Sequence, residues 1–208
     1  MPKGSRELTK TRKDEIINAC EKLYGTMNFR DITLGDISRE TSFSRPSIYN
    51  YFRTKEEIFL ALMQREYDLW NADLLAVIHD NDTLTADELA GAIAHSLENR
   101  PRLLKLLSMN HYDMEENSRP ERLTEFKRSY GGSLDAVRKC LTKFCPDMDE
   151  DARERFIFVF FPFMFGIYPY AVTTEKQLAA MEEAGVKFTK CSVYKMIYNC
   201  VRKMLVEK

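Results

Sequence analysis

The sequence has few residues that interrupt helices and no run that predicts a β-strand. Its 208 residues include only eight glycines and seven prolines. No stretch alternates apolar and polar residues for long enough to predict a strand. With 44% hydrophobic and 30% charged residues, the chain has the composition of a globular protein with a real core. We therefore expect an all-α fold.

The sequence also lacks the segments that direct a protein to a membrane or out of the cell. The N-terminal residues are basic but contain no apolar core of a signal peptide, and nowhere do about 18 uncharged apolar residues occur in a row. Five cysteines are odd in number and unclustered, which predicts free thiols and no disulfide framework. We expect a cytoplasmic protein with no membrane partner.

Signatures of metal sites and of catalysis are missing too. The three histidines, His79, His95 and His111, are far apart in sequence, and Cys140 and Cys145 have no partners at metal-ligand spacing. No nucleophile with a base, phosphate-binding glycine loop or paired carboxylate motif stands out. The sequence thus predicts no metal, no cofactor, no catalytic residue and no enzymatic activity.

Charge is distributed unevenly along the chain. Residues 1–55 contain eleven Lys and Arg against seven Asp and Glu, whereas the remainder contains twenty against twenty-five. A basic head on an acidic body points to a polyanionic partner for the head only. We expect a DNA-binding domain at 1–55 and a helical regulatory and dimerisation domain at 56–208.

Capping signals divide the head into short helices. Apolar residues from Ile16 to Tyr24 share one helical face, and that helix is expected to end at 25–28. Thr33 and Ser44 are N-cap candidates for the next two helices, and Thr54 with Glu57 forms a capping box before a long fourth helix. The expected helices span 34–40 and 45–51 and then begin at 55.

The same signals predict a helical body. A capping box at Thr85 opens one helix, Ser118 is expected to open another, and Gly185 stops a short one. Pro162 lies inside a strongly apolar helix and is expected to kink it. The expected helices begin at 85 and end near 99, begin at 102, reach from 118 to 144, and span 151–171, 175–184 and 189–206.

Two short helices joined by a tight turn are typical of a helix-turn-helix, which lays its second helix in the major groove of DNA. Arg45 can donate two hydrogen bonds to a guanine edge. Tyr49 and Tyr51 suit phosphate contacts, although at least one is expected to pack partly inward. Lys55, at the positive end of the next helix, would meet the DNA backbone. The predicted DNA-binding residues are Thr33, Ser44, Arg45, Ser47, Tyr49, Asn50, Tyr51 and Lys55.

The residues from Phe29 to Ser38 and from Ser44 to Phe59 resemble the N-terminal domain of the TetR family of transcriptional repressors. The resemblance extends from about Ile16 to Met63. It implies an all-helical homodimer that binds a palindromic operator in double-stranded DNA and a small molecule in its C-terminal domain. Asn28 and Ser42 replace glycines that are frequent in the family, and Asn enters the left-handed region more easily than most residues.

The body is rich in aromatic residues, which favours a core, an oligomer interface and a pocket for an apolar or aromatic ligand. The predicted ligand-binding residues are Trp70, Met109, Tyr112, Phe126, Tyr130, Phe161 and Phe165. Two apolar helices are expected to pair with their symmetry mates in a dimer. The predicted interface residues are Phe156, Phe160, Phe163, Tyr194, Ile197 and Val201.

The leading hypothesis is a homodimeric repressor that a small molecule releases from a palindromic operator. One alternative is a DNA-tethered adaptor whose body recognises a protein and needs no small molecule; a closed body without a cavity would favour it. Another is a thiol sensor that uses Cys140 with Cys145 or Cys191 with Cys200. The residues also allow an ordinary helical subdomain with no DNA contact.

Overall fold

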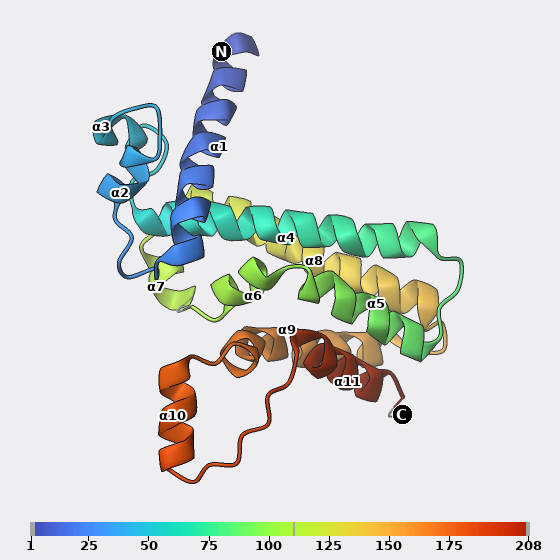
Figure 1. The fold of residues 1–208 in the computed structure, drawn as a ribbon. Helices are drawn as coiled ribbons and strands as arrows, with labels where there is room; N and C mark the ends of the chain where they lie inside the picture. The colour runs from blue at the N-terminus through green and yellow to red at the C-terminus, as the bar shows by residue number, and fades with distance from the viewer. Residues whose placement is uncertain (1–2, 110, 207–208) are drawn as a thin grey trace. The chain divides into compact units, whose positions relative to one another are not determined.

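The computed structural model describes residues 3–109 and 111–206, and in these residues the chain is helical with no strand (Figure 1). The all-α prediction is confirmed. The helices are α1 (Lys3–Thr26), α2 (Leu34–Arg39), α3 (Arg45–Ile48), α4 (Lys55–Asp80), α5 (Ala86–Glu98), α6 (Pro101–Leu107), α7 (His111–Glu116), α8 (Pro120–Phe144), α9 (Glu150–Ala171), α10 (Glu175–Glu183) and α11 (Val193–Val206).

The chain divides into two compact units that are discontinuous in sequence. The first unit contains residues 1–65 and 110–129, and the second contains residues 66–109 and 130–208. The first unit therefore holds the predicted helix-turn-helix together with α7 and the beginning of α8. Helices α4 and α8 each contribute their N-terminal part to the first unit and their C-terminal part to the second.

Several helix boundaries follow from the predicted caps. The Thr33 hydroxyl accepts from the Asp36 N–H, and the Asp36 carboxylate accepts from the Thr33 N–H in a complete capping box. Thr85 and Glu88 make the same arrangement before α5. Gly185 has φ of +66°, a left-handed conformation that glycine adopts without steric cost after α10.

Other boundaries differ from the prediction. Helix α1 begins at Lys3, well before the apolar stripe, and α7 was not predicted. The Ser118 hydroxyl donates to the Met114 carbonyl at the end of α7 and does not open α8. Pro162 lies inside α9 as predicted, and the kink stays a prediction. A helix as short and polar as α7 has no apolar periodicity, so the sequence pattern does not predict it. Such a helix depends on tertiary packing for its stability.

The core of the first unit forms where α1 and α4 meet the helix-turn-helix. The side chains of Ile16, Ile37 and Ile48 have no exposed surface. The Phe59 ring makes edge contacts with Tyr24 and Phe29, at centroid distances of 5.2 and 4.8 Å. Each short helix thus contributes one branched apolar side chain to a core that it could not form alone.

The second unit is built around buried aromatic rings. Trp70, the only tryptophan, is fully buried, and its ring centroid lies 6.0 Å from that of Phe161. Its indole N–H donates to the Ser96 hydroxyl at 2.9 Å. At the surface, α5 and α11 pack together, and Asp87 accepts hydrogen bonds from Tyr198 and Arg202. The α5 and α11 pair is therefore held by both apolar packing and a surface ion pair.

Among the described helices, no single one is long and apolar enough to cross a membrane. Only α9 and α10 taken together pass that test, and they are bent by 83° at the break between them.

We expect Ser96→Ala to lower the free energy of unfolding by about 1–3 kcal/mol, because the buried Trp70 N–H loses its acceptor. Urea titration followed by tryptophan fluorescence measures this directly, since Trp70 is the only emitter of its kind. The control is Thr83→Ala, which removes an exposed hydroxyl of the same unit. An equal effect of the two substitutions would mean that the Ser96 hydrogen bond contributes nothing.

Candidate nucleic-acid interface

Six of the eight predicted DNA-binding residues lie at α3 and the turn that follows it, whereas Thr33 precedes α2 and Lys55 begins α4. Ser44, Arg45 and Asn50 are exposed, and the Tyr49 side chain is 46% exposed. Arg45 donates a hydrogen bond to the Tyr49 hydroxyl at 3.3 Å, so the two side chains lie together on the outer face of α3. This surface has the polar, cationic character that base edges and phosphates require.

Two of the predicted residues, Thr33 and Ser44, are the N-cap residues of α2 and α3. Thr33 is exposed, but its hydroxyl and N–H are both engaged with Asp36. These hydrogen bonds from Thr33 lower the pKa of Asp36. Ser44 occupies the N-cap position of α3 but makes no capping hydrogen bond, and its hydroxyl instead lies 3.3 Å from that of Ser47. Ser44 thus stands at the predicted N-cap position of α3, but its side chain does not form the capping hydrogen bond.

The tight turn of the motif needs no left-handed residue. In the described residues no residue other than glycine has a positive φ, so Asn28 and Ser42 both adopt ordinary backbone conformations. The Ser42 N–H donates to the Glu15 carboxylate of α1, and the Asn28 carbonyl accepts from the Asp31 N–H. Neither the α1–α2 loop at Asn28 nor the α2–α3 turn at Ser42 therefore requires a glycine.

Lys55 is engaged inside the protein. Its ammonium group donates to the carbonyls of Phe29 and Ile32 at 2.8 and 3.1 Å and lies 4.4 Å from the Phe29 ring centroid. These contacts tie the start of α4 to the loop between α1 and α2. Contact of Lys55 with the DNA backbone remains a prediction, and in this structure its three donors are directed to carbonyls, including that of Arg30.

Tyr51 is half-buried, which confirms that one of the two tyrosines packs partly inward. Its ring lies 6.3 Å from the Phe43 ring, and its hydroxyl accepts a hydrogen bond from Arg12 of α1 at 3.4 Å. Arg12 is exposed and adds a cation beside the predicted surface. Sequence reasoning missed this residue, because Arg12 and Tyr51 are 39 positions apart.

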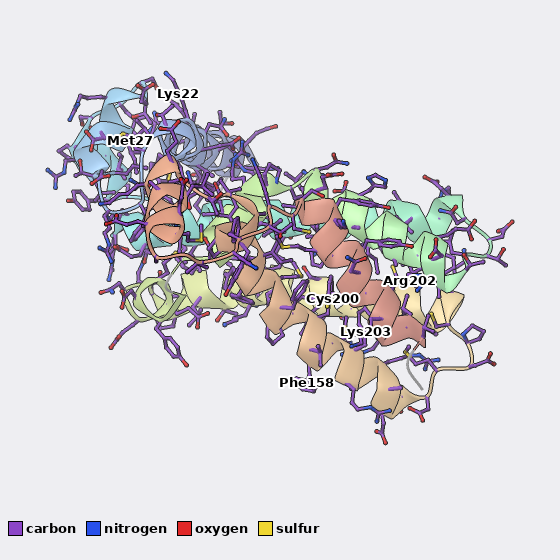
Figure 2. All side chains as sticks on the ribbon, turned by 60° about the horizontal axis from the view of Figure 1, so that its bottom comes forward. Lys22, Met27, Phe158, Cys200, Arg202 and Lys203 are labelled. Atoms are coloured by element: carbon purple, nitrogen blue, oxygen red, sulfur yellow. The ribbon has the colours of Figure 1, made fainter. Side chains whose placement is uncertain are left out.

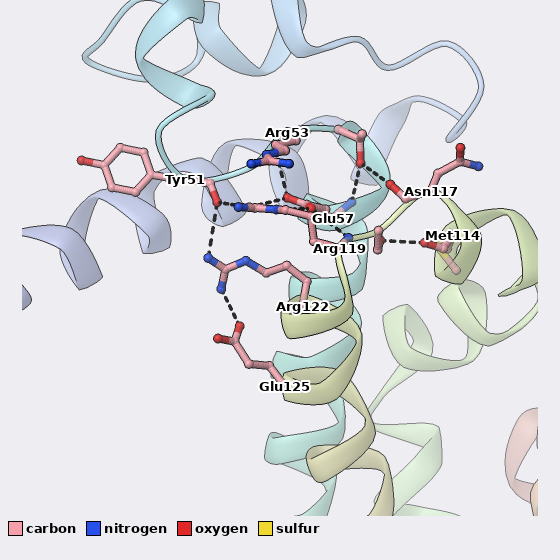
Figure 3. Close-up of polar contacts among 10 residues, drawn as sticks. Tyr51, Arg53, Glu57, Met114, Asn117, Arg119, Arg122 and Glu125 are labelled. Atoms are coloured by element: carbon pink, nitrogen blue, oxygen red, sulfur yellow. Dashed lines mark hydrogen bonds and ion pairs between the residues drawn. The ribbon is translucent and has the colours of Figure 1, made fainter.

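An ion pair between the buried Glu57 carboxylate and the half-buried Arg119 guanidinium joins the start of α4 to the residue before α8 (Figure 3). The Glu57 side chain is 0% exposed, and its two oxygens accept from the Arg119 guanidinium at 2.6 and 2.8 Å. The same carboxylate accepts from the backbone N–H groups of Arg119 and Arg53. The Thr54 hydroxyl accepts from the Glu57 N–H, as the predicted cap requires, but the Glu57 carboxylate binds the N–H of Arg53, one residue before the predicted partner.

The electrostatics of Glu57 follow from these contacts. Burial by itself raises the pKa of a carboxyl group, but the hydrogen bonds from the Arg119 side chain and from the N–H groups of Arg53 and Arg119 outweigh burial and hold the pKa of Glu57 below its ordinary value. Glu57 is therefore ionised at neutral pH, and the charge strengthens every bond that it accepts.

The predicted ligand-binding residues divide between the two units. Trp70, Tyr130 and Phe161 come together in the second unit, where the ring of Tyr130 lies 5.8 Å from that of Phe161. Met109 and Phe165 belong to the same unit and are half-buried. Phe126 is buried in the first unit. Tyr112, also in the first unit, is 87% exposed, so it does not line an enclosed cavity there.

The predicted interface residues are largely unavailable to a partner. Phe156, Phe160, Ile197 and Val201 are buried within the second unit, and only Phe163 and Tyr194 are half-exposed. The prediction for the four buried residues is corrected, because their side chains already pack inside one chain. The exposed apolar surface of α9 instead contains Phe158, Val159, Pro162 and Tyr170.

Of the large hydrophobic residues of α9, Phe158 is the most exposed, and it projects from the helix (Figure 2). Its side chain is 75% exposed, although it has no polar atom. Next to it along α9, Phe163 lines an apolar surface groove of about 520 Å³. The groove also involves Ile167, Tyr170, Phe188 and Met196. The second unit thus has both an unpartnered apolar face and a hollow of ligand size.

Four of the five thiols are poorly suited to redox sensing. Burial raises the pKa of Cys140 to about 12, and burial also raises the pKa of Cys20, Cys145 and Cys200. Since the thiolate is the reactive form, these groups are held in their unreactive state at neutral pH. In the described part of the chain, no three His, Cys, Asp or Glu side chains are arranged to hold a metal ion.

Family models match almost the whole chain. The model described as "Bacterial regulatory proteins, tetR family" matches residues 16–62, and the model described as "Tetracyclin repressor-like, C-terminal domain" matches residues 64–196. A curated relative, the uncharacterized HTH-type transcriptional regulator YfiR of Bacillus subtilis, is 31% identical over 67 residues. That match covers 32% of this chain and 33% of the relative, so the chain matches about a third of the relative's length.

Solved structures share the fold. A TetR/AcrR family regulator from Thermobifida fusca has a TM-score of 0.58 and 17% identity, with 94% of this chain and 97% of that chain covered. FadR from Bacillus subtilis, solved in complex with stearoyl-CoA, has a TM-score of 0.54 and 18% identity, with 92% and 96% covered. At these identities the similarity is one of fold.

We expect the stabilising effect of Glu57 to depend on pH. Because its pKa is lowered by folding, its contribution is fully present above the unfolded-state pKa of about 4.3 and is lost as the pH falls through the folded-state pKa. Glu57→Gln should lower the free energy of unfolding by about 2 kcal/mol at pH 7.

The difference between wild type and Glu57→Gln should shrink as the pH falls below about 4.3. Urea unfolding at a series of pH values, followed by circular dichroism, measures both quantities. Glu56→Gln is the matched control, since it removes the same charge one residue away at a half-buried position. A difference that stays constant down to pH 3 would contradict the assignment of the charge to this ion pair.

Proposed function

Because this chain belongs to the tetR family of bacterial regulatory proteins and is a DNA-binding transcriptional regulator, we propose that it is a homodimeric repressor. In this proposal it binds a palindromic operator and is released by a small molecule bound in its C-terminal half. The DNA-binding part of this proposal rests on one observation: the side chains of Arg45, Tyr49 and Asn50, on α3 and the turn after it, are exposed to solvent.

In the proposed complex, α3 enters the major groove. Arg45 reads a guanine with two hydrogen bonds, and Ser47 and Asn50 make further polar contacts to bases or phosphates. Tyr49 and Tyr51 donate to phosphates, and Arg12 adds a phosphate contact from α1. The net positive charge of residues 1–55 draws this surface to DNA and makes affinity fall with salt.

Dimerisation is proposed to use the outer face of α9. The side chains of Phe158 and Val159 are exposed to water in one chain, and a second copy would cover them around a twofold axis. A twofold dimer presents two recognition helices to half-sites about one helical turn apart. This symmetry is the reason for proposing a palindromic operator.

The ligand is proposed to be a small molecule with apolar or aromatic bulk, bound in the second unit. The groove of about 520 Å³ beside Phe163 has the size of a small-molecule site and a largely apolar lining. This hollow supports the ligand-released repressor over the protein-binding adaptor, for which a closed body was expected. The ligand must favour the conformation that does not fit the operator, because it shifts the equilibrium only by its differential affinity.

The first test is to mix the purified protein with fragmented genomic DNA and to sequence the retained fragments. A shared palindrome would establish the operator and supply the probe for every later measurement. A ligand panel that releases that probe should include long-chain acyl-CoA, because a structural neighbour was solved with stearoyl-CoA. Retention of DNA without a common site would refute sequence-specific repression.

We expect Arg45→Ala to weaken operator binding by about 1–3 kcal/mol, because two hydrogen bonds to one base pair are lost. Binding to a scrambled duplex should change much less. Fluorescence anisotropy with both duplexes at one salt concentration measures the two affinities. The control is Lys190→Ala, which removes an exposed cation of the second unit. Equal losses on operator and scrambled DNA would refute base reading by Arg45.

We expect Phe158→Asp to convert the dimer to a monomer, because a carboxylate at the centre of the proposed interface would be buried without a partner. Sedimentation equilibrium measures the dissociation constant, which should rise at least about a hundredfold. Leu75→Asp is the matched control, since Leu75 is an exposed leucine on α4. A dimer unaffected by Phe158→Asp would place the interface elsewhere.

A further inference from the structure

The recognition helix is very short and is not self-supporting. Helix α3 contains only Arg45–Ile48, and the chain then turns, with the N–H groups of Tyr51 and Phe52 both donating to the Ile48 carbonyl. A single helical turn is unstable in water without tertiary support. The side chains that would read DNA therefore depend on groups that hold the end of this turn.

Two arginines contact the Tyr51 carbonyl at the end of this turn: Arg119, just before α8, and Arg122, in its first turn. The carbonyl accepts from Arg119 Nη2 at 3.1 Å and from Arg122 Nη2 at 3.5 Å (Figure 3). The Arg122 guanidinium also lies 5.6 Å from the Phe52 ring centroid. Two cations from the start of α8 thus converge on the residue that ends the recognition segment, although they are about 70 positions away in sequence.

Glu57 orients the Arg119 guanidinium for this contact. Arg119 uses Nε and Nη2 on the two carboxylate oxygens, and Nη2 also reaches the Tyr51 carbonyl. This pattern uses the planar fork of arginine, because a lysine has a single ammonium nitrogen and cannot place two parallel N–H donors on the two carboxylate oxygens. The Arg53 N–H binds the same carboxylate, so the chain on both sides of Phe52 is held by one ion pair.

The loop before α8 is attached to the same place. The Thr54 hydroxyl donates to the Asn117 carbonyl at 3.0 Å, while the Arg119 N–H donates to Glu57. Arg122 is in turn paired with Glu125 on its own helix. All of these groups belong to the first unit, and together they form a continuous polar layer between the α3–α4 connection and the α7–α8 connection.

We propose that Arg119, oriented by Glu57, is a positioning residue for DNA reading: it holds the Tyr51 carbonyl and thereby the direction in which α3 presents its side chains. Arg122 supplies a second, longer hydrogen bond to the same carbonyl. The inference rests on the proposed role of α3 as the reading helix. It assigns to the start of α8 a function in DNA selectivity without any contact to DNA.

The test uses Arg119→Lys in the full chain, which keeps the charge but loses the fork. The operator-to-scrambled affinity ratio is expected to fall about tenfold, the effect of losing one charge-assisted hydrogen bond. Affinity for scrambled DNA should not change, because net charge is unchanged. Arg128→Lys is the matched control, since Arg128 is an exposed arginine of α8 in the same unit.

Amide hydrogen exchange without DNA supplies an independent reading. In Arg119→Lys the amides of Tyr51, Phe52 and Arg53 should exchange at least about tenfold faster than in wild type, while the amide of Leu62 within α4 is unchanged. Faster exchange together with a lower affinity ratio would support the proposal. Faster exchange with an unchanged ratio would show a purely structural ion pair and overturn it, as would no change in either quantity.

Two further variants keep the proposal testable. If Arg119→Lys does not fold, Arg122→Lys removes the longer hydrogen bond and leaves the Arg119 contacts in place. It should lower the affinity ratio in the same direction by a smaller factor, and an unchanged ratio would overturn the proposal. The double variant Glu57→Gln with Arg119→Lys should be no less selective than the worse single variant, because the two groups act as one unit. Additive losses would contradict orientation by Glu57.

A failure of the proposed function has a different signature. If wild-type protein does not distinguish any retained fragment from scrambled DNA, the assignment of α3 as a reading helix fails, whatever Arg119 does. If wild type is selective and Arg119→Lys is equally selective, only the positioning role fails.

Discussion

The carboxylate of Glu57 has no exposed surface, so its charge is stabilised entirely by groups of the protein. The Arg119 guanidinium and two backbone N–H groups provide this stabilisation. The donors come from two connections of the first unit, since Arg53 lies between α3 and α4 and Arg119 lies between α7 and α8. The start of α4, the end of the recognition segment and the start of α8 are consequently fixed by one charge, and none of them can shift without leaving it unsatisfied.

This constraint accounts for a recognition helix of one turn. A longer helix could hold its own direction, whereas α3 depends on Ile48 in the core below it and on the Tyr51 carbonyl at its end. The exposed side chains of Arg45 and Tyr49 do not take part in this support; they make a hydrogen bond to each other. Support and reading are thus carried by different residues.

Helix α9 illustrates how far an apolar pattern can be interpreted. Its residues from Phe156 to Tyr170 are apolar on every side, so periodicity does not indicate which side faces the core. The prediction assigned Phe156 and Phe160 to a partner, but these rings pack within the second unit, and Phe158 and Val159 face outward. A shift of one or two positions along a helix turns a side chain by 100° to 200°, which is enough to exchange core for surface.

The sequence by itself determined the all-helical fold, the boundaries set by the Thr33 and Thr85 capping boxes, and the family of the N-terminal segment. The capping boxes join residues three positions apart, and the other features are read from patterns along contiguous sequence, so neither requires knowledge of tertiary contacts. Only the tertiary structure decided that Lys55 binds carbonyls, that Ser42 needs no left-handed turn, and that Arg119 reaches Glu57 and Tyr51. Partners some 25 to 70 positions apart meet because the core packs in one way, and no local pattern in a single sequence encodes that packing.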